Sequence, residues 1–414
     1  MRTRLSGTLL CTFVALTLTW ACRAEPSSTT PQKLEGKLVL KLPFRASQAQ
    51  APSRVRRNTM QDIGYFRAGA AGDKGGNFYG AMLCTDNQGR FYFYDPINPK
   101  LALLRCVARN GYEVARWKLP IPDADYRASV TPDGYVWIAA NDYEIRKGNF
   151  PVVIYKFGQT KPIIDWRTKP PFDVGKFVEK TLGKKYFNAL SAIKKEEATA
   201  WEAEFLGMSQ GKIQLEITNY GVGYISDPQP SDKQPAITIR WTLSSDSKKT
   251  LQRDVYKSPT LRTKQRLASD GTQWYFADDY SFKTSKWSKA WLWKKGEQKG
   301  QPLITFEELM NPQGWWYKTF DFGKRWSNPP GFRVDGSGLT YLTFSQDNES
   351  YYDGEKTAVI FNKQKQPVAY IPWIPFPAYL TKWIFPLADG SGFYRQEKDD
   401  KELRIYFYAL PKAK

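Results

Sequence analysis

The sequence predicts an all-β fold built from repeated four-stranded units, and three observations support this prediction. A glycine is followed six to nine residues later by the Asp or Asn that ends an apolar strand, and this happens six times. Further apolar strands follow each of these strands after a loop and a short turn. The strands are rich in aromatic and β-branched residues, as β-strands usually are. The six pairs are Gly89/Asp95, Gly134/Asn141, Gly221/Asp227, Gly271/Asp278, Gly338/Asp347 and Gly392/Asp399.

The strands that follow each pair recur in the same order. The best-matched stretches are residues 135–140, 152–155 and 163–166, then 274–277, 290–293 and 303–306, then 339–344, 358–361 and 368–371. A four-stranded unit of this kind cannot bury its own faces, so repeated units pack side by side into a ring. The sequence therefore predicts a β-propeller over residues 36–414, with six blades by direct count. Seven blades are the alternative if the longest interval hides another sheet.

The two ends of this region predict how the ring closes. The last unit stops one strand short at Lys414, and the alternating residues Lys37 to Leu42 could supply that strand. Pairing them would cover the open edges of the last blade. The alternative is that residues 37–42 form an edge strand elsewhere.

Two insertions lengthen the repeat. Residues 173–206 carry apolar residues near helical spacing, which predicts one or two helices laid against the ring. Residues 307–330 are rich in Trp, Lys, Arg, Pro and Gly, which predicts a long aromatic and basic loop.

Residues 1–21 have the pattern of a secretory signal peptide. Arg2 and Arg4 precede an apolar run from Leu9 to Trp20, which is short for a membrane span. We therefore expect export.

The end of this segment, Leu18-Thr19-Trp20-Ala21-Cys22, resembles the cleavage box of bacterial lipoproteins. The resemblance covers five residues and departs from the usual pattern at Thr19 and Trp20. It implies a lipid on Cys22, and cleavage after Ala21 or Ala24 without lipid is the alternative. Residues 22–35 would then form a tether to the membrane of the cell envelope.

The cysteine count agrees with an exported fold. Cys11 lies in the signal and Cys22 would carry lipid, so that Cys84 and Cys106 remain. We place these two in the first and third strands of one blade. Next-but-one strands lie about 9.5 Å apart, beyond the reach of a disulfide, so we expect two buried thiols.

Composition excludes several kinds of chemistry. The 414 residues include no histidine, which excludes Ser-His-Asp catalysis and His metal sites. No phosphate-binding loop or dinucleotide fingerprint occurs. Carboxylate, Tyr, Lys or Arg chemistry stays open, and we assign no catalytic residue.

The formal net charge of +20 favours an anionic partner. A cluster of Arg and Lys in residues 23–57 would hold a lipid-anchored protein close to acidic headgroups, and a merely solvated basic face is the alternative. We expect no nucleic-acid partner, because export argues against one. An anionic envelope surface or a protein partner is expected.

The strand-end acids predict a ligand site on one face of the ring. They could bind calcium or a basic ligand, or supply the carboxylate pair of a glycan-cleaving enzyme. The alternative is that Asp and Asn end strands because their side chains bond to nearby backbone. The candidates are Asp95, Asp142, Asp227, Asp278, Asp279 and Asp347.

The second insertion offers another candidate site, because aromatic faces stack on sugar rings and nearby cations bind acidic groups. A glycan ligand would suit it. The alternative is that these rings cap the end of the propeller. The candidates are Trp315, Trp316, Lys318, Arg325 and Trp326.

The repeat pattern over residues 36–414 resembles the broad NHL/TolB-like group of six-bladed bacterial propellers, without a family-specific motif. The resemblance implies a binding or interaction protein. The alternatives are an exported carbohydrate-active hydrolase or lyase and a purely structural envelope protein.

Overall fold

A computed structural model gives the fold of most of the repeat region. It describes residues 30–44, 65–67, 77–79, 81–98, 101–119, 126–131, 134–140, 152–165, 200–209, 212–220, 237–244, 250–257, 262–267, 272–279, 287–322, 330–347, 354–375, 383–398 and 401–411.

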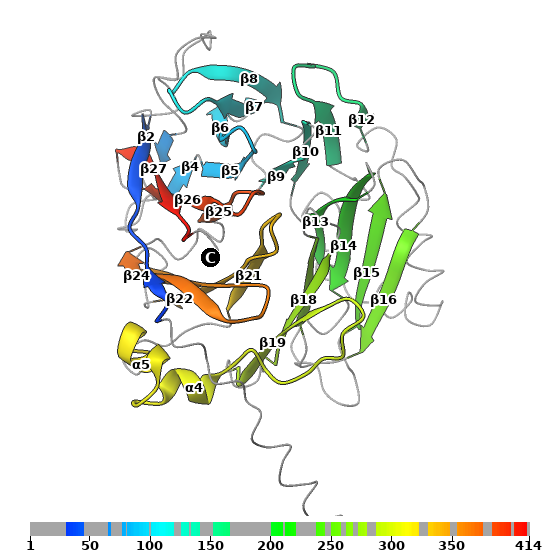
Figure 1. The fold of residues 1–414 in the computed structure, drawn as a ribbon. Helices are drawn as coiled ribbons and strands as arrows, with labels where there is room; N and C mark the ends of the chain where they lie inside the picture. The colour runs from blue at the N-terminus through cyan, green and yellow to red at the C-terminus, as the bar shows by residue number, and fades with distance from the viewer. Residues whose placement is uncertain are drawn as a thin grey trace, which may run out of the picture.

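These residues form a β-propeller in which antiparallel sheets surround a centre (Figure 1). The first four complete sheets are consecutive along the chain. They comprise β5 (Ala81–Thr85), β6 (Phe91–Asn98), β7 (Leu101–Val107) and β8 (Glu113–Lys118); β9 (Tyr126–Val130), β10 (Tyr135–Ala140), β11 (Val152–Lys156) and β12 (Ile164–Asp165); β13 (Ala200–Ser209), β14 (Lys212–Tyr220), β15 (Ile237–Ser244) and β16 (Thr250–Lys257); and β17 (Arg262–Leu267), β18 (Gln273–Asp278), β19 (Lys289–Lys294) and β20 (Ile304–Thr305).

The remaining sheets combine strands from both ends of the described chain. A five-stranded sheet and a four-stranded sheet complete the ring, and a two-stranded hairpin stands apart from them. They comprise β1 (Gln32–Lys33) with β21 (Gly331–Val334), β22 (Thr340–Asp347), β23 (Gly354–Phe361) and β24 (Pro367–Pro375); β2 (Lys37–Pro43) with β25 (Ile384–Pro386), β26 (Gly392–Lys398) and β27 (Glu402–Ala409); and the hairpin of β3 (Tyr65–Arg67) and β4 (Asn77–Tyr79).

Five sheets are regular four-stranded blades, so the predicted count of six such blades is not confirmed. The remaining large sheet has the same four-stranded meander, with β1 added in parallel beside β24. Among the described residues no further sheet supports the alternative of seven. The first strands of neighbouring sheets contact one another along the chain from β5 to β21, as expected for strands that line the centre of a propeller.

The predicted closing strand is confirmed. β2 pairs antiparallel with β27, with Leu38 opposite Tyr406 and Leu42 opposite Leu403. The alternation of β2 places Leu42, which is 1% exposed, in the apolar core between the closing sheet and the first sheet. Closure thus buries an edge that would otherwise stay open.

A buried amide joins the last sheet to the first. The side chain of Gln396 on β26 accepts the backbone N–H of Met82 at 2.9 Å and donates to the backbone oxygen of the same residue at 3.3 Å. Gln396 is 1% exposed, so it satisfies backbone groups of β5 that no water reaches.

Two ends of the ring differ in their connections. We call the end with the turns between first and second strands, and between third and fourth strands, the turn end. The opposite end, with the connections between second and third strands and between blades, is the loop end. Because β5 to β27 form meanders, the described strand ends Asp95, Asp278 and Asp347 belong to the loop end.

The structure corrects two predicted boundaries. Gln32 and Lys33, placed in the tether, pair with β24, and the next residue, Leu34, is buried. The last seven residues of the predicted helical insertion, 200–206, belong to β13, while residues 173–199 lie outside the described residues.

The predicted loop at 307–330 includes two short helices, α4 (Phe306–Met310) and α5 (Trp315–Phe320). Thr305 is the N-cap residue of α4 and forms a capping box. Its hydroxyl accepts the N–H of Glu308, and the Glu308 carboxylate accepts the N–H of Thr305. Within the described residues no helix has the length and apolarity to cross a membrane.

The two thiols lie where the sequence predicts. Cys84 on β5 and Cys106 on β7 flank Tyr92 on β6, and both are buried and reduced. Burial raises the pKa of the Cys106 thiol to about 12, so this residue is a core side chain and not a nucleophile.

Candidate functional site

The structure describes four of the six predicted strand-end acids. Asp95 lies within β6, whereas Asp278 and Asp347 are the last residues of β18 and β22. Asp142 and Asp227 lie outside the described residues. In the part of the chain that the structure describes, no group of three or more Asp, Glu, Cys or His side chains could hold a metal ion.

Asp95 belongs to a buried ionic network within the first sheet. Arg105 on β7 binds Asp95 through Nη1 at 2.7 Å and Glu113 on β8 through Nε at 2.5 Å. Arg116 binds the second oxygen of Glu113, also at 2.5 Å. The two guanidinium and two carboxylate groups balance one another in charge, and Asp95 is fully buried while Arg105 is 3% exposed.

This network explains the charge state of Arg105. Burial by itself would lower the pKa of Arg105, but Asp95 and Glu113 outweigh burial and raise this pKa above its ordinary value. Removing one partner would leave a buried charge uncompensated, which costs several kcal/mol, typically about 3–5. Asp95 therefore stabilises the pairing of β6 with β7, and Glu113 links β7 to β8.

Asp279 caps the connection between β18 and β19. Its Oδ1 accepts the backbone N–H groups of Ser288 and Lys289, each at 2.7 Å, and its Oδ2 accepts the Ser288 hydroxyl. Partial burial would raise the pKa of Asp279, but these hydrogen bonds prevail and lower it. Its neighbour Asp278 is buried at the end of the strand. The geometry at Asp279 matches the local backbone bonding that was the alternative for these acids.

The aromatic residues of the second insertion pack onto the ring. Trp315 lies edge-on to Tyr370 with ring centroids 5.9 Å apart, and Trp316 lies at the same distance from Phe344. The indole of Trp373 on β24 donates to the backbone oxygen of Phe320 at 2.6 Å.

Helix α5 is thus a cap on the five-stranded sheet, as the alternative held. Trp315 and Trp316 are partly buried against the core of the ring, and only Lys318 among the described candidates here is exposed. Arg325 and Trp326 lie outside the described residues.

A second set of acids, which the sequence reading did not single out, lies in the turns between first and second strands. Asp86 accepts the backbone N–H of Arg90 at 3.0 Å and the hydroxyl of Tyr92 at 2.9 Å. Asp335 accepts the backbone N–H of Leu339 at 2.9 Å and the hydroxyl of Tyr341 at 3.1 Å. The two sites repeat the same geometry in two sheets.

A readable sequence signal accompanies this geometry, namely Asp, then Gly three residues later, then Tyr three residues after that. The glycines are Gly89 and Gly338, and both adopt positive φ. In the last sheet the turn glycine is Gly390, with φ of 70°, and not the predicted Gly392. Gly392 begins β26, where a Cβ would meet the backbone oxygen of Tyr408.

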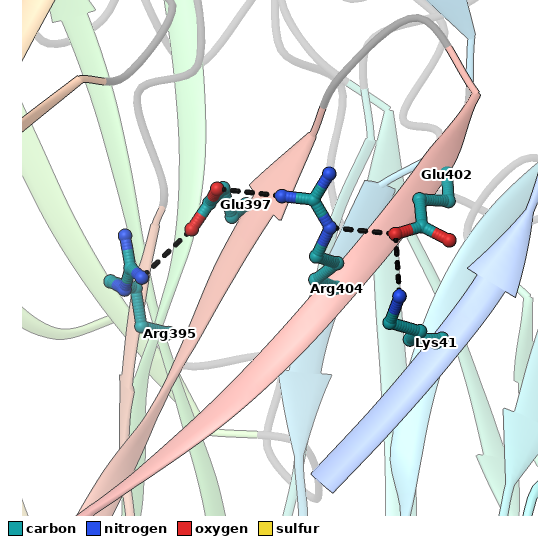
Figure 2. Close-up of polar contacts among 5 residues, drawn as sticks. All are labelled: Lys41, Arg395, Glu397, Glu402 and Arg404. Carbon is teal, nitrogen blue, oxygen red and sulfur yellow. Dashed lines mark hydrogen bonds and ion pairs between the residues drawn. The ribbon is translucent and has the colours of Figure 1, made fainter. Parts of the chain in front are cut away.

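A ladder of charges crosses the closing sheet, as Figure 2 shows. Lys41 on β2 binds Glu402 at 3.1 Å, and Arg404 binds the same Glu402 oxygen at 2.7 Å. Arg404 also binds Glu397 at 2.9 Å, and Glu397 binds Arg395 at 2.9 Å. The ladder links β2, β27 and β26, so it favours the register in which the closing strand pairs.

The turn end carries exposed cations, while the acids of its Asp-to-Tyr turns are buried. Asp86 is 7% exposed and Asp335 is 4% exposed. Each described turn between third and fourth strands contributes an exposed cation. We call these four residues the basic rim: Arg109, Lys161, Lys295 and Lys363.

Comparisons with known proteins add no functional assignment. No protein-family description matches the chain, and neither does any curated protein sequence. Similar solved structures include an oligogalacturonate lyase in complex with manganese, with 7% identity, 92% of this chain and 99% of that chain covered, and a TM-score of 0.43. Another is a Penicillium chrysogenum α-L-arabinanase complexed with arabinobiose, with 11% identity, 92% and 100% covered, and a TM-score of 0.45. These values are too low to transfer an activity.

Proposed function

We propose that this protein is an exported β-propeller that binds a partner in the bacterial cell envelope and is held there by a lipid on Cys22. One observation carries the proposal: three of the candidate acids and aromatics are engaged within the fold. Asp95 neutralises Arg105, Asp279 caps a loop, and Trp315 packs on the core. At the turn end, each described turn between third and fourth strands carries an exposed cation.

The architecture supports an anchor at the N-terminal side. β1 and β2 begin ten and fifteen residues after Cys22, and both are paired into the ring. A lipid at Cys22 would therefore hold a closed ring through a short tether. We count the five-stranded sheet as the sixth blade in this proposal, and membership of the NHL/TolB-like group remains a prediction.

Metabolic labelling tests the anchor. Cells that express the full chain are fed an alkyne analogue of palmitate, and the protein is isolated and probed for label. We expect label on the wild type and none on Cys22→Ala, with the variant released from the membrane fraction. An unlabelled wild type would overturn the proposed anchor.

A glycan panel tests binding against catalysis. Each polysaccharide is incubated with the protein, and both retention of protein and release of new chain ends are measured. Retention without release is the expected result for a binding protein, with an anionic or protein partner if no glycan is retained. Release of chain ends above the buffer rate would overturn the proposal in favour of a carbohydrate-active enzyme.

Calcium is the metal ion that carboxylates of the loop end would suit, and we keep it as a proposal. Equilibrium dialysis with radioactive calcium measures it directly. We expect the double variant Asp279→Asn, Asp347→Asn to lose calcium binding. If the double variant still binds calcium, the ion lies elsewhere.

A further inference from the structure

We propose that the basic rim is the surface with which the propeller docks onto anionic lipid headgroups. The inference rests on the proposed envelope function and names the surface and the partner. It is drawn from three features of the turn end: the placement of the cations, the burial of the acids, and the point at which the chain enters the ring.

The cations of the basic rim recur from blade to blade. Arg109 lies in the turn after β7, Lys161 in the turn after β11, Lys295 in the turn after β19 and Lys363 in the turn after β23. Because each turn occupies the same position in its sheet, the four charges are spread around one end of the ring. A flat array of this kind suits an extended anionic surface better than a single small anion.

Two of these cations rest on turn glycines of their own sheets. A Cβ on Gly89 would overlap the Arg109 guanidinium, and one on Gly338 would lie 3.0 Å from Cε of Lys363. In both sheets the cation thus lies across the left-handed glycine of the neighbouring turn. The side chains are therefore supported by packing at the surface.

The acids of the turn end compensate this charge only in part. Asp86 and Asp335 are turned inward onto backbone N–H groups and tyrosine hydroxyls. Among the described residues, the exposed acids at this end are Glu35, Glu297 and Asp389. Glu297 pairs with Lys365 at 3.3 Å, and Asp389 accepts the N–H and hydroxyl of Ser391.

The chain enters the ring at this same end. Gln32 on β1 lies opposite Ala369, just after the turn that carries Lys363, and Lys37 on β2 lies opposite Phe407 near the end of β27. From Cys22 to Thr30 the chain spans at most about 29 Å when fully extended. A lipid on Cys22 would therefore be joined to the ring at its turn end.

The test compares two triple variants that remove the same charge from opposite ends. The rim variant is Lys161→Gln, Lys295→Gln and Lys363→Gln. The control variant is Lys118→Gln, Lys289→Gln and Lys401→Gln, three exposed lysines of the loop end. Both are made in the full chain with Cys22→Ala, so that lipid attachment plays no part.

Partition into vesicles of phosphatidylcholine with 30 mol% phosphatidylglycerol is measured against vesicles of phosphatidylcholine alone, and the ratio isolates the electrostatic contribution. One cation near an anionic surface contributes about fivefold in partition. We expect the rim variant to lose up to about a hundredfold in this ratio, and the control variant less than about fivefold. The loss should shrink as salt rises, because salt screens the attraction.

Equal losses in the two variants would overturn the docking surface, since only net charge would then matter. No loss in the rim variant would overturn it too. The palmitate experiment is independent of this outcome: a labelled protein whose rim variant binds normally keeps the anchor and loses the docking surface. Preferential binding to an anionic protein instead of vesicles would also refute the lipid partner.

Discussion

The closing strand offers the sharpest test of the fold, because β2 contains two leucines in opposite environments. Leu42 is 1% exposed in the core shared with Leu403 and Ile405, whereas Leu38 is 40% exposed. Truncating a buried leucine to alanine costs about 2–5 kcal/mol, through lost burial and the cavity left behind. A substitution at a surface site usually changes stability by no more than about 0.5 kcal/mol.

The assay is limited trypsin digestion under native conditions, with cleavage after Lys37 and Lys41 as the readout for release of β2. A loss of 2 kcal/mol in Leu42→Ala raises the released population by about thirtyfold, since 1.4 kcal/mol is a factor of ten. The rate of cleavage after Lys37 and Lys41 should rise by the same factor, because trypsin cuts the released form. Leu38→Ala should be cut at close to the wild-type rate. Equal rates for the two variants would refute the conclusion that β2 closes the ring.

Three further predictions follow from single residues. Burial raises the pKa of Asp335. The stabilising contribution of Asp335 is therefore complete below its ordinary pKa of 3.8 and is lost as pH rises through the raised value. The free energy of unfolding measured in urea should decline from pH 4 upward in the wild type but not in Asp335→Asn, and equal pH profiles would contradict this. The Cys106 thiol, with its pKa raised to about 12, should resist iodoacetamide at pH 8 until urea unfolds the protein, and rapid native labelling by mass spectrometry would show an open site. Gly134→Ala should cost about 1–2 kcal/mol because φ is 84°. Gly300→Ala should leave the melting temperature unchanged, because its Cβ would meet only the Gln298 backbone oxygen, at 4.0 Å. Similar melting temperatures for the two variants would argue against the left-handed turn.

Local patterns were sufficient to predict most of the strands. The alternation of β2 predicted both a strand and its buried face, and the positions of Cys84 and Cys106 in first and third strands followed from hydrophobic runs. Such features depend on neighbours along the chain, so they can be read directly. The capping box of Thr305 and Glu308 was equally readable and would have predicted α4.

The choice between two glycines was not readable in the same way. Gly390 and Gly392 both fit a turn in the sequence, and only the pairing of Gly392 with Ala409 assigns one to the turn and the other to a strand. The role of Asp95 was equally hidden. Asp95 pairs with Leu103 on the neighbouring strand, whereas its ionic partner Arg105 lies two residues further along that strand.

By itself, the sequence determined that the chain is an all-β repeat closed by a strand from its N-terminal side, because alternation, turn residues and glycines act over a few residues. Tertiary structure alone decided how many sheets are regular blades, which acids are buried and which turns share one end of the ring. These properties depend on register and on contacts between sheets that are far apart in the chain, such as the bond from Gln396 to Met82. Of the strand-end acids that first suggested a ligand face, Asp95 and Asp279 are parts of the scaffold. The basic rim lies at the opposite end of the ring.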